Sequence, residues 1–187
     1  PAVRNAMKML DMREMRITYE ADLPARSGLG TSSSFAVGML NAFHCMKGTC
    51  ASKQRLATEA IVLERDLCAE AGGWQDQIAA AFGGLNRIDF ASDSFSVRPI
   101  VVSPERKREL EGNLMMFFTG FTRFSSDMQK KNCVADKIAQ LKEILDLVDV
   151  AEGVLADKSK DLAEFGRLLD TSWRLKRGAG GQVSTGA

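Results

Sequence analysis

The chain has 187 residues, of which 45% are hydrophobic, and its 25 Lys and Arg nearly balance its 24 Asp and Glu. This length allows a substantial core in one domain or two small ones, and the balanced charge argues against a long polyanionic partner such as a nucleic acid. A membrane partner is not expected either, because no apolar run approaches the roughly 20 residues that a spanning helix needs.

The first half of the chain is predicted to be mainly helical. Pro1 to Leu10 has helical character, and residues 15–22 alternate apolar and polar side chains as a half-buried strand does. Apolar residues then recur at helical spacing up to Gly48. A second helix is predicted from Ser52 to about Ala71, and a short third helix from Trp74 to Phe82.

The second half begins with strands and ends with helices. Strands are predicted at Leu85 to Phe90 and at Phe95 to Val102, and the apolar run Asn113 to Gly120 indicates a strand buried on both faces. Apolar stripes from Val134 to Leu155 and along Asp161 to Lys176 predict helices packed on the domain rather than a free coiled coil. The fold class is therefore α/β or α+β.

The cysteines and the single histidine limit the available chemistry. None of the cysteines forms a C-x-x-C pair, so we expect reduced thiols that fill the core of a cytoplasmic protein: Cys45, Cys50, Cys68 and Cys133. His44, the only histidine, lies on an apolar helix, where we expect it to be packed or to face solvent. A histidine zinc site or a Ser-His-Asp hydrolase is therefore not expected.

The stretch "SGLGTSSS", residues 27–34, joins the predicted strand to the helix that follows. Glycines allow a close backbone approach, and free amides at the start of a helix bind anions, phosphate above all. The hydroxyls of Thr31, Ser32 and Ser33 add donors and candidate Mg²⁺ ligands, and Thr31 or Ser32 is expected to cap the helix. Because the P-loop lysine is missing, a plain glycine turn before a capped helix stays an equal alternative.

Two carboxylates follow this stretch. Glu64 shares an otherwise apolar helix face with Ala57, Ile61 and Cys68, so it needs a basic partner or a divalent cation. Asp76 falls in the first turn of a short helix, where it either caps the helix or takes a proton from a hydroxyl nucleophile. The glycine-rich stretch and these carboxylates, without a nucleophilic Cys or His pair, predict phosphoryl transfer.

Two segments carry a resemblance to a known family. "PARSGLGTSSS" resembles the second signature of the GHMP small-molecule kinases, P-x-x-x-G-L-G-S-S-A/S, with Thr31 in place of the first paired serine. "AGGWQDQIAAAFGGLNRIDF" is similar to the segment around that family's catalytic aspartate, most of all in sugar-1-kinases acting on D-glycero-D-manno-heptose 7-phosphate and next in L-fucose kinases. The resemblance implies the two-domain GHMP fold, with an ATP-binding domain at residues 1–102 and the start of a second domain at residues 103–187.

The resemblance also implies roles for individual residues. The ATP phosphates would be wrapped by Arg26, Ser27, Gly28, Leu29, Gly30, Thr31, Ser32 and Ser33. Ser32 and Glu64 would hold Mg²⁺, and Asp76 would be the catalytic base or orienting group. The sugar would lie near Gly73, Gln75, Thr119, Gly120 and Arg123.

The expected activity is ATP- and Mg²⁺-dependent phosphorylation of the anomeric hydroxyl of a sugar, with a phosphorylated heptose as the favoured acceptor. Arg26, Arg123, Lys176 and Arg177 are the candidates for its phosphate, although a solvated surface charge is the favoured interpretation of the last two. The family's first and third signatures are absent, so the chain is expected to be part of something larger and to lack part of the active site. An L-fucose kinase and a non-catalytic sugar or nucleotide sensor stay alternatives, and a homodimer stays open.

Overall fold

The computed structural model describes residues 1–22, 28–70, 72–117 and 138–178, which fall into two compact units. The first unit contains the described residues up to Gly84, and the second contains those from Leu85 onward. The expected domain boundary after residue 102 stays a prediction.

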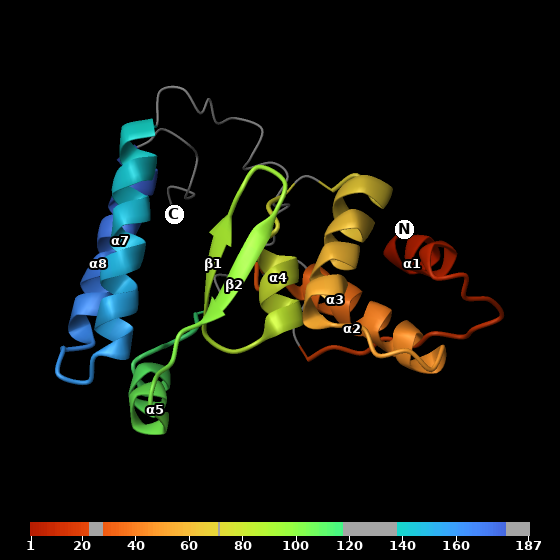
Figure 1. Ribbon diagram of the computed structural model, residues 1–187, viewed down its shortest axis with the longest axis horizontal. Helices are drawn as coiled ribbons and strands as arrows, with labels where there is room; N and C mark the ends of the chain where they lie inside the picture. Colours follow the sequence, from red (N-terminus) through yellow and green to blue (C-terminus); the bar gives the residue numbers. More distant parts are fainter. Residues whose placement is uncertain (23–27, 71, 118–137, 179–187) are drawn as a thin grey trace. The chain divides into compact units, whose positions relative to one another are not determined.

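The first unit is built from helices, which Figure 1 labels in chain order: α1 (Ala2–Met9), α2 (Thr31–Met46), α3 (Lys53–Ile61), η1 (Val62–Leu67) and α4 (Gln75–Phe82). Helix α2 lies in the middle of this unit and packs against the other four elements. Its apolar residues recur every three or four positions, so Leu40 and Phe43 both point into the core, together with Leu56 and Leu63. Burying a side chain of this size stabilises a fold by about 1.5–3 kcal/mol.

The predicted helices of this unit are confirmed, with corrections at their ends. Ser52 caps α3 by accepting a hydrogen bond from the amide of Arg55 at 3.1 Å. Helix α2 has Gly30 as its N-cap and no side-chain cap bond, so the expected cap at Thr31 or Ser32 is wrong. The reason is that the left-handed backbone of Gly30 starts the helix, which puts both hydroxyl residues inside its first turn.

The helix expected to run from Ser52 to about Ala71 changes character halfway. After Ile61 the backbone continues as the π-helix η1, in which the amide of Cys68 bonds to the carbonyl of Leu63 five residues earlier, at 3.0 Å. Ala69 then takes a positive φ of 55°, so the helical stretch stops before Ala71. Such single-turn π segments occur frequently at functional sites.

The strand expected at residues 15–22 is wrong, because residues 15–21 have no secondary structure. A strand exists only through hydrogen bonds to a neighbouring strand. None of the described residues supplies such a partner for this segment, since the only strands among them pair with each other.

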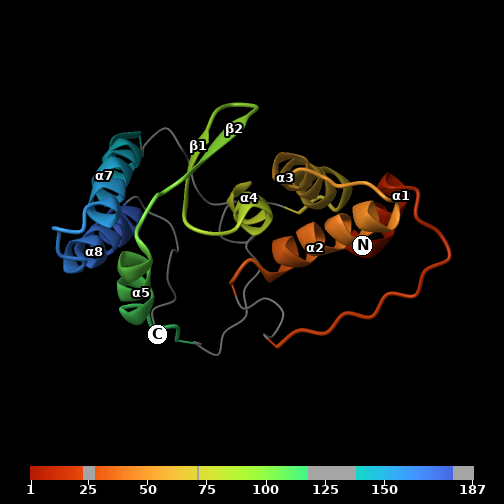
Figure 2. The same ribbon diagram turned by 60° about the horizontal axis from the view of Figure 1, so that its bottom comes forward.

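The second unit begins with a hairpin of two antiparallel strands, β1 (Asn86–Phe90) and β2 (Phe95–Pro99), with Ile88 opposite Val97. Both strands were predicted. The helices α5 (Pro104–Gly112), α7 (Ile138–Ala156) and α8 (Ala163–Gly178) follow. Helices α7 and α8 lie side by side in both views (Figures 1 and 2) and bury Val154, Leu155 and Leu162. The predicted C-terminal helices are thereby confirmed, although their apolar stripe is only partly covered.

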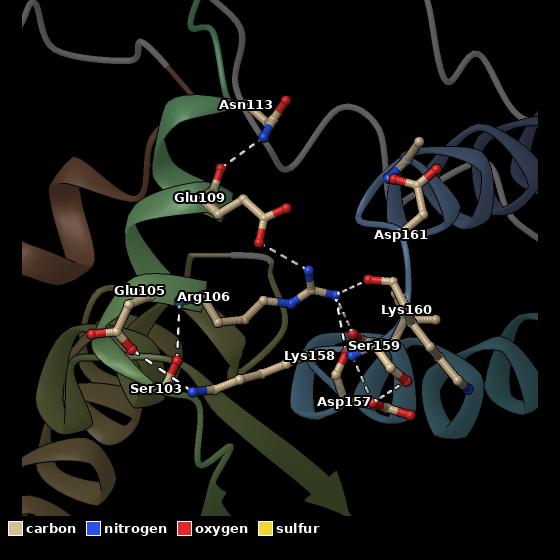
Figure 3. Close-up of polar contacts among 12 residues, drawn as sticks. Ser103, Glu105, Arg106, Glu109, Asn113, Asp157, Lys158, Ser159, Lys160 and Asp161 are labelled. Carbon is tan, nitrogen blue, oxygen red and sulfur yellow. Dashed lines mark hydrogen bonds and ion pairs between the residues drawn. The ribbon is translucent and has the colours of Figure 1, made fainter.

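The end of α7 is held by an arginine from α5. Arg106 is 4% exposed, and its Nη2 donates hydrogen bonds to the carbonyl oxygens of Val154 and Lys160, both at 2.8 Å (Figure 3). Its Nη1 donates to Glu109 at 3.0 Å. Because the last carbonyls of a helix lack intrahelical donors, a buried guanidinium is well suited to this position.

The strand expected from Asn113 to Gly120 is wrong over its described part. Asn113 ends α5 as its C-cap, and the apolar residues 114–117 are exposed and unpaired, while residues 118–120 lie outside the described part. A strand buried on both faces needs covering layers that the described residues do not provide. Helix α5 itself was not predicted, although Ser103 as N-cap and Pro104 in the first turn signal its start.

The described residues confirm the mixed helix and strand class. None of their helices is long and apolar enough to cross a bilayer. Cys45, Cys50 and Cys68 carry free thiols, and Cys133 lies outside the described part. The expectation that they fill the core is wrong for Cys45 and Cys50, because both are exposed.

Candidate functional site

Three segments of the first unit meet at a small pocket of about 60 Å³. The start of α2, the π-helix η1 and the start of α4 each contribute side chains to it. Six of the predicted site residues line it: Ser32, Ser33, Glu64, Gly73, Gln75 and Asp76. This volume suits an ion with its water or part of a phosphate, whereas pockets for whole small ligands measure about 300–1,000 Å³.

The glycines before α2 adopt the backbone that the pocket requires. Gly28 and Gly30 have φ values of 80° and 66°, a region that favours glycine. A Cβ atom added at Gly30 would lie 3.5 Å from Cβ and Cγ of Asp76, whereas one at Gly28 would meet nothing within 4 Å. The segment before α2 therefore touches the first turn of α4 at Gly30.

Glu64 is buried at the back of the pocket, with 4% of its surface exposed. The hydroxyl of Ser33 donates a hydrogen bond to Glu64 Oε2 at 2.7 Å, and Gln77 Nε2 donates to the same oxygen. These donors are neutral, and no basic side chain in the described part of the chain pairs with Glu64. The alternative of an ion pair at the core margin is therefore not supported by the described residues.

Asp76 lies at the mouth of the same pocket, in the first turn of α4. Trp74 is the N-cap of this helix, and no side chain makes a cap hydrogen bond. The alternative that Asp76 caps the helix is therefore wrong. Its exposed carboxylate lies at the positive end of the helix dipole, where a negatively charged side chain stabilises a helix.

Gly73 and Gln75 lie together beside Asp76. A Cβ atom added at Gly73 would fall 2.0 Å from Gln75 Oε1, so the Gln75 side chain uses the space that glycine leaves. Two further predicted residues are described but do not line the pocket: Leu29 is exposed, and Thr31 is the first residue of α2. The other predicted residues lie outside the described part: Arg26, Ser27, Thr119, Gly120 and Arg123.

The other residues singled out from the sequence are not among those that line the pocket. His44 is buried, with Nε2 2.6 Å from Glu59 Oε2 and Nδ1 3.2 Å from Thr49 Oγ1, so its packing role is confirmed. Lys176 and Arg177 are exposed in the last turn of α8, where cations interact favourably with the helix dipole.

Three polar residues that line the pocket were not predicted from the sequence: Arg65, Glu70 and Gln77. Gln77 contacts Glu64, which lies 13 positions earlier in the sequence, and no sequence pattern predicts that contact. Glu70 lines the pocket as well. Its pKa is raised, mainly because the carboxyl group is partly removed from water and also because the charge of Glu64 lies nearby. Its position just after η1, where the chain turns, could not be predicted without the π-helix.

Comparison with known proteins identifies the domain that carries this pocket. Residues 2–84 match the protein family described as "GHMP kinases N terminal domain". This part of the chain therefore matches a GHMP kinase domain, as its two motifs indicated.

Individual relatives are sugar kinases. The chain is 30% identical over 169 residues to D-glycero-alpha-D-manno-heptose 7-phosphate kinase from Campylobacter jejuni, an alignment that covers 86% of this chain and 48% of that protein. It is 29% identical over 181 residues to the bifunctional fucokinase/GDP-fucose pyrophosphorylase of Arabidopsis thaliana, covering 89% of this chain and 16% of that protein.

A solved structure supports the same fold. The crystal structure of a D-glycero-D-manno-heptose 1-phosphate kinase from Bacteroides thetaiotaomicron matches with a TM-score of 0.74 and 28% identity. The match covers 94% of this chain and 54% of that one. The chain thus has the fold of a GHMP kinase, and it spans about half the length of the heptose kinases that it matches.

Proposed function

We propose that the protein is a sugar kinase that uses ATP and Mg²⁺ to phosphorylate the anomeric hydroxyl of a sugar. The observation that supports this best is the pocket at which the start of α2, Glu64 and Asp76 meet within the matched kinase domain. The favoured acceptor is D-glycero-D-manno-heptose 7-phosphate, since relatives named for heptose phosphates match over most of this chain.

In this proposal residues 26–33 bind the phosphates of ATP. The first amides of α2 lack intrahelical acceptors and lie at the positive end of the helix dipole, and the left-handed glycines before them let the backbone approach a ligand closely. The exposed hydroxyl of Ser32 lines the pocket and adds a further oxygen.

The residues present fit a magnesium ion held together with a nucleotide. Glu64 is a buried carboxylate without a described basic partner, and no described residue donates to its Oε1. Among the described residues, no three His, Cys, Asp or Glu side chains are placed to surround a metal. Mg²⁺ does not need such a cage, because it is usually held by one or two carboxylates with water and substrate phosphates. When bound, it would neutralise phosphate charge.

Asp76 is proposed to act on the acceptor. Its carboxylate accepts the proton of the anomeric hydroxyl, whose oxygen then forms a bond to the γ-phosphorus of ATP while the bond to the bridging oxygen breaks and ADP leaves. Gly73 and Gln75, next to Asp76, are proposed to face the sugar, together with Thr119, Gly120 and Arg123.

The role of Asp76 can be tested by Asp76→Asn. General-base catalysis contributes about 10²–10⁴-fold, so kcat should fall by at least about 10²-fold while nucleotide affinity changes little. Asp93→Asn, an exposed residue between β1 and β2, is the matched control and should keep its kcat. Near-normal turnover of Asp76→Asn would remove this residue from the mechanism.

The acceptor is tested by comparing turnover with heptose 7-phosphate and with free L-fucose. An L-fucose kinase is the second candidate, because fucokinases from Arabidopsis thaliana and Bacteroides fragilis also match over 89% and 85% of this chain. A preference for unphosphorylated fucose would end the heptose assignment. A protein that binds ATP and phosphorylates no sugar would favour a sensor. The cytoplasmic location and a homodimer stay predictions.

A further inference from the structure

Gln77 is the most deeply buried polar side chain of the pocket for which the sequence predicted no role. It is 5% exposed and lies in α4, directly after Asp76. Its Nε2 donates to Glu64 Oε2, the oxygen that also accepts the hydrogen bond of Ser33. Two donors from different helices therefore hold one oxygen of this carboxylate.

The orientation of the Gln77 amide follows from its partner. Nε2, the donor end of the amide, faces Glu64 Oε2, which accepts its hydrogen bond. Gln77 Oε1 is then left buried, with no donor among the described residues. A buried acceptor without a partner costs about 1–3 kcal/mol, and such a group in a functional pocket needs an explanation.

We infer that Gln77 is a positioning residue that, with Ser33, fixes the carboxylate of Glu64 so that Oε1 is presented to a divalent cation. This inference rests on the proposed function. The unpaired Gln77 Oε1 supports it independently, because a hydrated cation brings O–H donors to the pocket and Mg²⁺ usually keeps several of its waters. Groups that orient a metal ligand in this way typically change metal affinity by about 10–100-fold when they are removed.

The test is direct metal binding by the full-length protein. Mn²⁺ is titrated in the presence of ADP, and free Mn²⁺ is followed by electron paramagnetic resonance. Gln77→Met keeps the volume and removes the donor, so the Kd for Mn²⁺ should rise by about 10–100-fold. Gln54→Met, at an exposed glutamine of α3 that does not line the pocket, is the matched control and should bind Mn²⁺ as the wild type does.

A purely structural role gives a different result. In that case Gln77→Met lowers Tm and leaves the Kd for Mn²⁺ unchanged, which overturns the inference. If Gln77→Met does not fold, Gln77→Asn replaces it, since its amide is one methylene too short to reach Glu64, and the same rise in Kd is expected.

Glu64→Gln separates this inference from the proposed function. Weakened Mn²⁺ binding in Glu64→Gln with unchanged binding in Gln77→Met overturns only the role of Gln77. Unchanged Mn²⁺ binding in Glu64→Gln contradicts the metal role of Glu64, and with it the function proposed above. Weakened binding in both variants supports both.

Discussion

At the scale of single residues, the contact between Gly30 and Asp76 links the segment proposed to bind phosphate to the proposed catalytic residue. Gly28 and Gly30 share a left-handed backbone, but only Gly30 lies against another side chain. The two glycines can therefore be compared directly. The same substitution strains the backbone equally at both positions, but only at Gly30 does the new side chain meet Asp76.

The change to alanine at either glycine should lower the free energy of unfolding by about 1–2 kcal/mol, the usual cost of a left-handed non-glycine residue. Only Gly30→Ala places a methyl group 3.6 Å from Asp76 Oδ2, where it covers one side of the carboxylate. We expect kcat to fall further in Gly30→Ala than in Gly28→Ala. Steady-state kinetics measures kcat, and urea denaturation measures the free energy of unfolding of the same variants. Equal kcat values in the two variants would show that the contact between residue 30 and Asp76 does not affect catalysis.

Single residues were predictable where their own chemistry was unusual. Glu64 was predicted as a carboxylate on an apolar helix face, and Asp76 as an acidic residue in a first helical turn. Both line the pocket. Their neighbours were not predictable in the same way. The bonds from Ser33 and Gln77 join residues 31 and 13 positions away from Glu64, so they follow from the packing of three helices rather than from any local pattern.

At the scale of elements, charged side chains fasten the hairpin of the second unit to α7. Arg87 of β1 contacts Asp149 and Glu152, and Arg98 of β2 contacts Glu152 at 2.8 Å. The hydrogen bonds from Arg87, and next those from Arg98, lower the pKa of Glu152. A carboxyl group whose pKa is lower in the folded state stabilises the fold at neutral pH.

Replacing Glu152 with Gln should therefore lower the free energy of unfolding at pH 7. The stabilising effect of the carboxylate is fully present above the ordinary glutamate pKa of about 4.3, and it is lost as the pH falls through the lower pKa of the folded state. Urea denaturation between pH 7 and pH 3 should show wild type and Glu152→Gln converging at acid pH. Glu143→Gln, exposed on the same helix, should follow the wild type throughout. A constant difference at all pH values would contradict the ionic origin.

Helices and strands were predicted correctly where their sequence signals are local. The prediction failed for two segments that have a strand pattern but no strand to pair with among the described residues. Helical periodicity predicted α2, α4, α7 and α8, and Ser52 marked the start of α3. Both strands of the hairpin were also predicted, β2 from its alternating residues. The alternating residues 15–22 and the apolar residues 113–117 satisfy the same rules, yet they form no strand, because pairing is a property of two segments. The π-helix η1 has no sequence signal in this chain.

At the scale of the whole molecule, each compact unit has its own buried core and its own tryptophan. Trp74 belongs to the first unit, beside the pocket, and Trp173 lies on α8 in the second. The second unit also depends on the buried Arg106, whose hydrogen bonds join α5 to the end of α7 (Figure 3). A defect placed at Arg106 should therefore be seen first through Trp173.

Arg106→Met can be followed in two backgrounds that keep one tryptophan each. Trp74→Phe keeps Trp173 as the fluorescent probe, and Trp173→Phe keeps Trp74. The substitution leaves buried carbonyl oxygens without donors, each costing about 1–3 kcal/mol, so the urea midpoint read from Trp173 should fall clearly. Arg108→Met is the control on the same helix, because its 73% exposed side chain makes only surface contacts, a hydrogen bond to the Pro104 carbonyl and an ion pair with Glu105, and such an exposed pair is worth about 0–1 kcal/mol. If each unit unfolds around its own core, Trp74 fluorescence should keep its midpoint in Arg106→Met. An equal shift at both tryptophans would mean that the two units unfold as one cooperative body, and the stability of the candidate site would then depend on an arginine outside its own unit.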